Sequence, residues 1–213
     1  VVNKLRWKLK KKYGIKRFKV GHAGTLDPLA TGLLLICTGK KTKISQELTS
    51  DDKVYTGKIL LGKTTPSYDL ETDFDKENDT SHLKKDLSEI EKISAQFVGE
   101  QDQLPPIFSA KKINGKRAYE SARKGQEIEM RSNTINISYF EIDTKDFPVI
   151  SFKVKCSKGT YIRSLAHDFG AKLGVGGTLI ELRRTESGKF NIQDAKTVEE
   201  WLEIIEETTV EVE

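Results

Sequence analysis

The run GHAGTLDPLATG at residues 21–32 places a carboxylate, Asp27, in a loop rich in glycine. Its glycines permit backbone conformations and close approaches that other residues resist, and Pro28 disfavours a helical conformation at Asp27. A carboxylate held ionised by nearby cations can act as a nucleophile or a general base. The alternative is an aspartate that only hydrogen-bonds within its own turn, and the residues taken alone favour this alternative.

The same loop lacks the patterns of two common ligand-binding loops. It has no terminal Gly-Lys-Ser/Thr of a phosphate-binding loop, and its glycine spacing differs from that of a dinucleotide-binding loop. The histidines and cysteines of the chain show no metal-ligand spacing; they are His22, His82, His167, Cys37 and Cys156. We therefore expect no metal site. Two cysteines are too few for a disulfide framework, which indicates reduced thiols in a cytoplasmic protein.

Charge is unevenly distributed along the chain. Residues 1–26 contain nine lysine or arginine residues and no acidic residue, whereas residues 194–213 contain eight acidic residues and one lysine. The net charge of +4 therefore understates how basic the rest of the chain is. A basic surface fits a polyanionic partner, because phosphate contacts dominate such binding. A solvated face of a basic helix is the alternative.

The hydrophobic pattern predicts the elements that must position these residues. Helical periodicity predicts helices at 2–14, 82–97, 160–174 and 197–207. Apolar runs and alternation predict strands at 33–37, 53–62, 133–143, 149–157 and 176–190, with loops at 18–32 and 64–79. Strands and helices follow one another without the regularity of βαβ units. The pattern therefore predicts a mixed α/β (α+β) domain around a mostly antiparallel sheet flanked by helices.

The length of 213 residues suits one domain with a small appendage. We assign residues 1–192 to the main domain and residues 193–213 to a short acidic helix and tail, too short for a full C-terminal RNA-binding domain. Residues 99–131 carry two prolines and seven basic residues, and we expect them to project from the domain. No apolar stretch approaches the roughly 18 residues of a membrane span, and no secretory signal is visible.

The segment GHAGTLDPLATGLLLICTGKKTK at 21–43 resembles the signature of the TruB family, whose members isomerise a uridine in the T-loop of tRNA to pseudouridine. Three further segments match in the family's order, at residues 53–73, 105–125 and 156–190. The resemblance covers most of residues 18–190 and contains no gap in its first segment. These motifs therefore indicate a resemblance to a family of RNA-modifying isomerases.

The resemblance implies a fold, a reaction and a partner. The fold would be that of pseudouridine synthases, with a central mostly antiparallel sheet, flanking helices and an RNA-gripping insertion at 99–131. The reaction would isomerise the uridine at tRNA position 55, after the base is flipped out of its loop. It involves no redox change and no hydrolysis, so it needs no cofactor. The partner would be the T-arm of tRNA, with no membrane, no obligate protein partner and a monomeric enzyme.

Individual residues also receive roles from the resemblance. Asp27 would be the catalytic carboxylate, acting either on the ribose carbon or on a ribose proton, and Arg163 would pair with it and keep it ionised. Tyr55 would stack on the flipped base. Tyr161 would lie beside the reacting carbon and assist proton removal, and Leu182 would close the apolar wall of the pocket. Plain core positions are the alternative for Tyr55 and Leu182.

Two further positions carry weaker roles in the resemblance. His22 would help to extract or position the T-loop, and Asp69 would position the nucleotide or Arg163. A loop histidine bonded to backbone and a loop-capping aspartate are the alternatives. The spacing of Tyr161 and Arg163 places Tyr161 at the junction of a strand and a helix.

The chain departs from the family pattern in two places. It opens at VVNKLRW, already inside the first predicted helix, so we expect the family's preceding strand to be missing from this sequence. Phe108 stands where the family often has tyrosine. Two other functions use the same motifs: a non-catalytic tRNA-binding or tRNA-folding protein, and a guide-RNA-dependent synthase, whose members carry a longer C-terminal domain.

Overall fold

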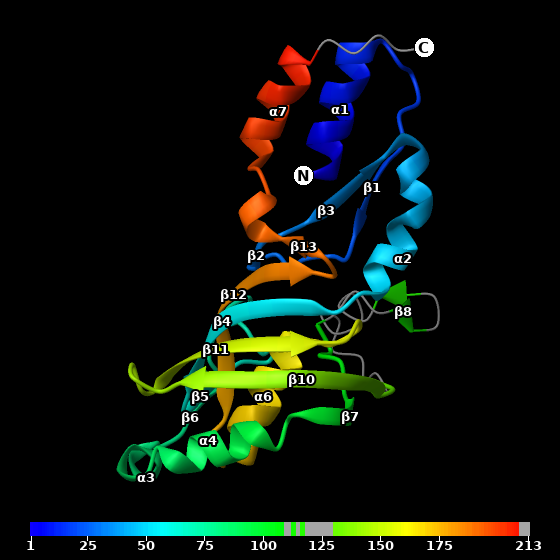
Figure 1. Ribbon diagram of the computed structural model, residues 1–213. Coiled ribbons are helices and arrows are strands. Elements are labelled where there is room, and N and C mark those ends of the chain that lie inside the picture. Colours follow the sequence, from blue (N-terminus) through cyan, green and yellow to red (C-terminus); the bar gives the residue numbers. More distant parts are fainter. Residues whose placement is uncertain (109–111, 114–115, 118–129, 209–213) are drawn as a thin grey trace.

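The computed structural model describes residues 1–108, 112–113, 116–117 and 130–208. Its centre is a seven-stranded sheet with the order β13-β12-β4-β11-β10-β7, and β2 lies beside β12 (Figure 1). Every pairing along that path is antiparallel, and only β2 runs parallel to its neighbour. The strands are β2 Thr31–Gly32, β4 Lys53–Leu61, β7 Gly99–Gln103, β10 Asn133–Asp143, β11 Val149–Cys156, β12 Gly177–Ser187 and β13 Phe190–Asn191. The prediction of a mixed α/β fold with a mostly antiparallel sheet is confirmed.

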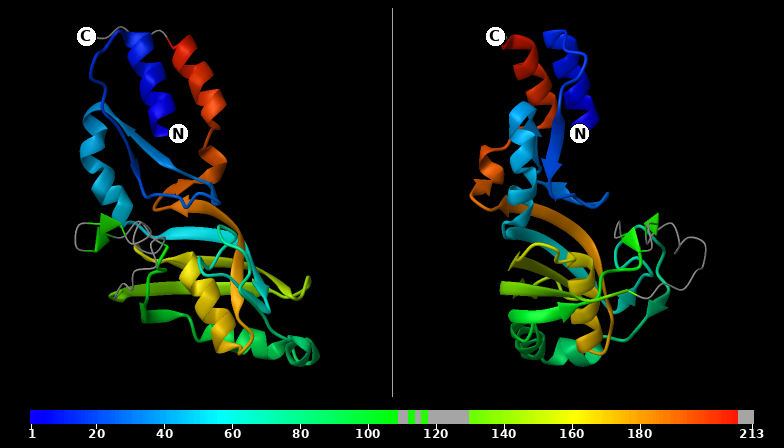
Figure 2. Two further views of the ribbon diagram at one scale, coloured as in Figure 1. Left: turned by 180° about the vertical axis from the view of Figure 1, so that it is seen from behind. Right: turned by 90° about the vertical axis from the view of Figure 1, so that its right-hand side faces the viewer.

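Two helices cover the core of this sheet. Helix α6 (Ile162–Lys172) packs against β12, and α4 (Ser88–Ala95) packs against β10 and touches α6 (Figure 2). Between them, Phe140 meets Phe97, Phe152 and Phe169 edge to face, a favoured geometry for aromatic rings. This core fixes α6 against the sheet, and α6 begins directly after Tyr161, one of the predicted site residues.

The helix predicted at 82–97 is wrong as a single element, because the structure divides it into α3 (Ser81–Lys85) and α4. Asp86 leaves the helical conformation, with φ −142° and ψ 85°. Its carboxylate accepts hydrogen bonds from the backbone N–H of Ser88 at 3.0 Å and from its hydroxyl at 2.6 Å. Such a local turn competes with the helix. The apolar stripe survives the break, since Leu83 and Ile90 are both fully buried.

Two predicted loops contain short strands. Within 18–32, β1 (Val20–Ala23) pairs antiparallel with β3 (Leu35–Thr38), and β2 follows near the end of the run. Within 64–79, the hairpin of β5 (Lys63–Thr64) and β6 (Lys76–Glu77) frames the segment. Strands this short, and rich in glycine or charge, give too little hydrophobic alternation to be predicted.

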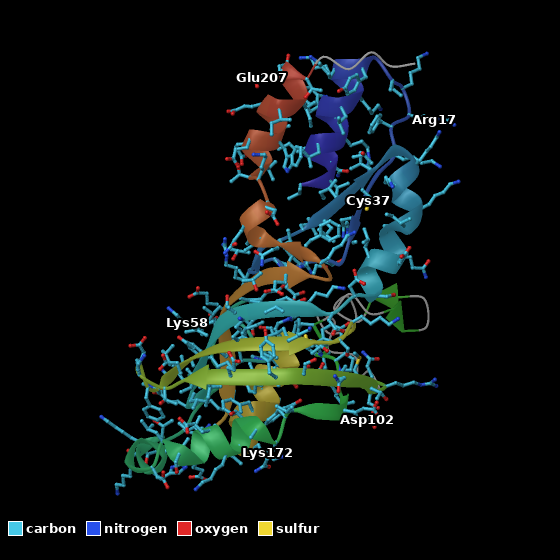
Figure 3. All side chains as sticks on the ribbon, viewed as in Figure 1. Arg17, Cys37, Lys58, Asp102, Lys172 and Glu207 are labelled. Carbon is cyan, nitrogen blue, oxygen red and sulfur yellow. The ribbon has the colours of Figure 1, made fainter. Side chains whose placement is uncertain are left out.

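The N- and C-terminal helices lie side by side, away from the central sheet (Figure 1). Helix α1 (Val2–Tyr13) ends at Gly14 with φ 63°, as predicted, and α7 (Val198–Glu207) opens with a capping box at Thr197. Lys4 and Lys8 of α1 form ion pairs with Glu199 and Glu206 of α7. Figure 3 shows Arg17 and Glu207 at this same end of the molecule. The 3-10 helix Gly39–Ile44 and α2 (Ser45–Ser50) follow β3.

The predicted insertion at 99–131 is described only in part. Its first residues form the edge strand β7, paired with β10. Strands β8 (Lys112–Ile113) and β9 (Lys116–Arg117) form a small hairpin that lies off the central sheet (Figure 2). The remaining residues from 109 to 129 lie outside the described residues. Among the helices that the structure describes, none is long and apolar enough to cross a membrane.

Candidate active site

Asp27 occupies a tight turn between β1 and β2. The backbone N–H of Ala30 donates to the carbonyl of Asp27 at 3.0 Å, and Pro28 holds the second position of the turn, where its fixed φ fits. The turn is followed by Gly32, which has φ 105° and lies so close to β12 that an added Cβ would stand 2.2 Å from the carbonyl oxygen of Arg184. Only glycine permits this approach. The loop of residues 24–33, called the Asp27 loop below, therefore packs directly on β12.

Arg184, for which no role was predicted, fastens this loop to the sheet. Its side chain is almost completely buried. The guanidinium donates to the carbonyl oxygens of Gly24 at 3.0 Å, Thr25 at 3.4 Å and Leu33 at 2.8 Å, and its own carbonyl accepts from the N–H of Leu33 at 2.8 Å. The planar fork of arginine suits such a set of acceptors. Both ends of the Asp27 loop are thus bound to one residue.

Arg163 reaches the loop from the first turn of α6. Its Nε donates to Oδ2 of Asp27 at 2.8 Å, and its Nη1 donates to the carbonyls of Phe108 at 3.0 Å and Ser67 at 3.3 Å. Only the backbone of Phe108 takes part in this contact. The predicted pairing of Arg163 with Asp27 is present in the structure. Such a charge-assisted hydrogen bond fixes the direction of the Asp27 carboxylate.

Asp69 is a second carboxylate beside Arg163. Its Oδ2 lies 3.6 Å from Nε of Arg163, and its side chain is buried. Its Oδ1 accepts the backbone N–H of Glu71 at 3.0 Å, so Asp69 also caps its own loop. Of the two predicted roles, the geometry supports the positioning of Arg163 together with the loop-capping alternative.

A pocket of about 380 Å³ opens beside the Asp27 loop. It is lined by Asp27, Arg163 and the three other residues predicted for the base site: Tyr55, Tyr161 and Leu182. Tyr55 lies on β4, opposite Arg184 of β12 in the sheet register, and Leu182 lies two residues before Arg184. Four different parts of the chain therefore converge on one cavity, which is large enough for a flat ring with its sugar.

Tyr161 stands at the N-cap of α6 in an extended conformation, with φ −97° and ψ 110°, as its spacing from Arg163 predicted. The side chain of Gln103 binds the backbone of Tyr161 on both sides, accepting from its N–H at 2.8 Å and donating to its carbonyl at 3.0 Å. Gln103 is a positioning residue that the sequence did not reveal. It fixes the point where the chain enters α6.

Burial shifts the pKa of two groups in the pocket. Burial raises the pKa of Tyr55, although the neighbouring guanidinium of Arg184 opposes this. The phenol is therefore neutral at ordinary pH. Burial also lowers the pKa of Lys53, and Arg184 acts in the same direction. Lys53 donates to the carbonyls of Thr49 at 2.7 Å and Asp51 at 2.6 Å, and thus ties β4 to the end of α2.

His22 lies outside the pocket lining. It is exposed on β1, opposite Ile36 of β3, so the structure does not bring it together with the other site residues. Among the residues that the structure describes, no three histidine, cysteine, aspartate or glutamate side chains are grouped as metal ligands.

Comparisons with known proteins give matches over nearly the whole chain. The sequence model of the TruB family pseudouridylate synthase N-terminal domain matches residues 10–162, and that of the tRNA pseudouridylate synthase B C-terminal domain matches residues 163–212. A protein of Parabacteroides distasonis, named tRNA pseudouridine synthase B, is 47% identical over 213 residues, which is all of this chain and 90% of that protein. Its namesake in Flavobacterium johnsoniae is 54% identical over 195 residues, 91% of this chain and 84% of that protein.

Solved structures show the same fold. A chain of a Cbf5-Nop10-Gar1 complex superposes with a TM-score of 0.60 at 29% identity, covering 88% of this chain and 45% of that chain. A chain of an H/ACA RNP bound to a substrate RNA containing 2'-deoxyuridine gives a TM-score of 0.57 at 28% identity, covering 86% and 42%. This chain thus spans less than half the length of those two. With family models matching from residue 10 to residue 212 and relatives this similar, the chain belongs to the TruB family of pseudouridylate synthases, which are isomerases.

Proposed function

We propose that this protein converts a T-loop uridine of tRNA, at position 55, into pseudouridine, with Asp27 as the catalytic carboxylate. The observation that carries the proposal is the 2.8 Å contact between Arg163 and Asp27 at the wall of a pocket that also holds Tyr55 and Leu182. The relatives named tRNA pseudouridine synthase B support tRNA as the substrate.

The reaction breaks the bond between N1 of uracil and C1' of the ribose, rotates the base, and joins C5 to the same C1'. The proton on C5 is then lost and N1 gains one, so the product is an isomer. Asp27 either attacks C1' or removes a ribose proton; both routes need an ionised carboxylate at the sugar. Arg163 orients Asp27, and Asp69 lies beside the same nitrogen, Nε of Arg163.

The rest of the pocket receives the base. Tyr55 stacks on the flipped uracil as a neutral ring, and Leu182 closes the apolar wall. Tyr161 lies beside C5 and assists removal of its proton. Flipping costs a few kcal/mol, which contacts with the T-arm must offset. His22, exposed on the strand that leads into the Asp27 loop, helps to extract or position the T-loop from outside the pocket.

We assign catalysis to residues 1–192 and a packing role to the acidic segment 193–213, because α7 pairs with the basic helix α1. The protein acts in the cytoplasm, as a monomer and without an obligate protein partner. Both cysteines are free and buried, which fits a reducing compartment. No cofactor takes part in the reaction.

The assay that tests this proposal uses the purified chain alone with an unmodified tRNA transcript that carries tritium at C5 of uracil. We expect tritium release equal to one uridine per tRNA, and none from a transcript with cytidine at position 55. Binding without release would instead indicate a tRNA-binding or tRNA-folding protein. Release only after addition of a guide RNA would indicate a guide-dependent synthase, the class suggested by the H/ACA RNP likeness.

A further inference from the structure

A stacked pair of rings lies one helical turn beyond the Arg163–Asp27 contact. The imidazole of His167, on α6, stacks on the phenol of Tyr68 with ring centroids 3.8 Å apart and an interplanar angle of 17°. His167 follows Arg163 by four residues, so the two side chains leave the same face of α6. Neither ring lines the pocket, and the reaction proposed above makes no use of them.

Tyr68 joins two partners of Arg163. The residue before it, Ser67, accepts from Nη1 of Arg163 through its carbonyl at 3.3 Å, and the residue after it, Asp69, places its carboxylate 3.6 Å from Nε. A rotation of the backbone at Tyr68 would move both groups. The conformation of this one residue therefore determines where both groups lie relative to the Arg163 guanidinium.

That conformation is unfavourable for tyrosine. Tyr68 has φ 66°, the left-handed region, and is the only residue other than glycine with positive φ among those the structure describes. Such a conformation is strained for a bulky residue and persists only where its surroundings enforce it. Here the Tyr68 N–H donates to Thr65 at 3.2 Å, its carbonyl accepts from Leu179 at 2.9 Å, and its ring is covered by His167.

We propose that His167 and Tyr68 form a stacked pair that positions Arg163, by holding Ser67 and Asp69 against its guanidinium. The catalytic consequence of this inference rests on the proposed function. His167 and Tyr68 are positioning residues, since neither touches Asp27. The pair acts through the loop 65–69, whose Thr65 and Ser67 hydroxyls also donate to the carbonyl of Asp69 at 2.7 and 3.1 Å.

His167 contributes a flat ring rather than a hydrogen bond at Nδ1. This atom is buried and has no hydrogen-bond partner within the described residues. Burial lowers the pKa of His167, although the carboxylates of Asp168 and Asp75 oppose this, so the ring is neutral near pH 7. A phenyl ring can therefore replace the imidazole, whereas a methyl group cannot stack.

The test compares His167→Phe with His167→Ala in the free protein and in catalysis. The first readout is the side-chain Nε–H resonance of Arg163 in a 15N-correlated spectrum, assigned by its loss in Arg163→Lys. We expect His167→Ala to shift this resonance and speed its exchange with water, and His167→Phe to restore the wild-type signal. Tyr68→Phe, which keeps the ring, should also resemble wild type. Tyr139→Ala, which removes a ring on β10 that faces Lys153, is the control.

The second readout is the single-turnover rate on tRNA. His167→Ala should lower it by about 10- to 100-fold, the size of effect expected when a reacting group is slightly misplaced, with little change in tRNA affinity. An unchanged Arg163 resonance in His167→Ala would overturn the inference, as would a His167→Phe protein that behaves like His167→Ala. The Arg163 resonance tests whether the His167–Tyr68 pair positions Arg163 even if wild-type protein turns over no tRNA. That lack of turnover would instead overturn the proposed function.

Discussion

Nε of Arg163 lies 2.8 Å from Oδ2 of Asp27, although the two residues are 136 positions apart in the sequence. The pair is asymmetric: the Arg163 side chain is 4% exposed, whereas the Asp27 side chain is 37% exposed. The cation is thus buried in the protein, and the carboxylate keeps an open side toward the pocket. A carboxylate that Arg163 orients on one side and that is accessible from the pocket fits a group that must reach a ribose.

Arg184 should be essential for the Asp27 loop. Arg184→Met keeps most of the volume but leaves three carbonyl oxygens, on Gly24, Thr25 and Leu33, without their donor. We expect the free energy of unfolding to fall by about 2–4 kcal/mol in urea denaturation. We also expect turnover to fall in the protein that remains folded, because the loop loses its attachment.

Arg183→Met is the matched control for this substitution. Arg183 is the preceding residue of β12, and its side chain is exposed. Its loss should change the free energy of unfolding by no more than about 0.5 kcal/mol. Equal effects of the two substitutions would show that Arg184 does not anchor the loop.

Tyr55 should matter more for turnover than for binding. Tyr55→Ala removes the ring that we propose stacks on the base, whereas contacts with the rest of the T-arm remain. Single-turnover rates should therefore fall more than the affinity measured by filter binding. Tyr55→Phe keeps the ring, and because burial already holds the Tyr55 phenol neutral, it should leave the pH dependence of turnover unchanged below about pH 10. Wild-type turnover by Tyr55→Ala would mean that Tyr55 is only a core residue.

Cys156 should make the protein sensitive to alkaline pH. Burial raises the pKa of its thiol to about 12, above the value of the unfolded chain. The contribution of Cys156 to the free energy of unfolding is therefore fully present below about pH 8.5. It is lost as the pH rises toward the folded-state pKa, because in that range only the unfolded state releases the proton. The free energy of unfolding should fall with pH more steeply in wild type than in Cys156→Ala, by up to about 1.4 kcal/mol per pH unit. Parallel curves for the two proteins would refute this.

The sequence predicted most elements of the sheet because their strands are long and apolar. It failed where tertiary contacts decide. The Asp86–Ser88 turn divides a helix whose apolar stripe is continuous. The short strands β1 and β2 have no hydrophobic alternation from which they could be predicted.

The site was predicted from the family resemblance more than from residue physics. The residues alone favoured Asp27 as a turn former, and its pairing with Arg163 depends on the whole fold. Arg184 was missed because an arginine in a strand suggests an exposed position. A signal was present, however: Arg184 follows Leu182 by two residues, and in a strand this spacing puts both on the same face.

We propose above that Asp27 performs the chemistry in this pocket. The most direct measurement is tritium release from C5-labelled tRNA by Asp27→Asn in a single turnover, with tRNA affinity measured in parallel. Asp73→Asn, which alters an exposed aspartate outside the pocket lining, is the control and should release tritium as wild type does. We predict that Asp27→Asn binds tRNA but releases no tritium, whereas release at the wild-type rate would show that Asp27 is not the catalytic carboxylate.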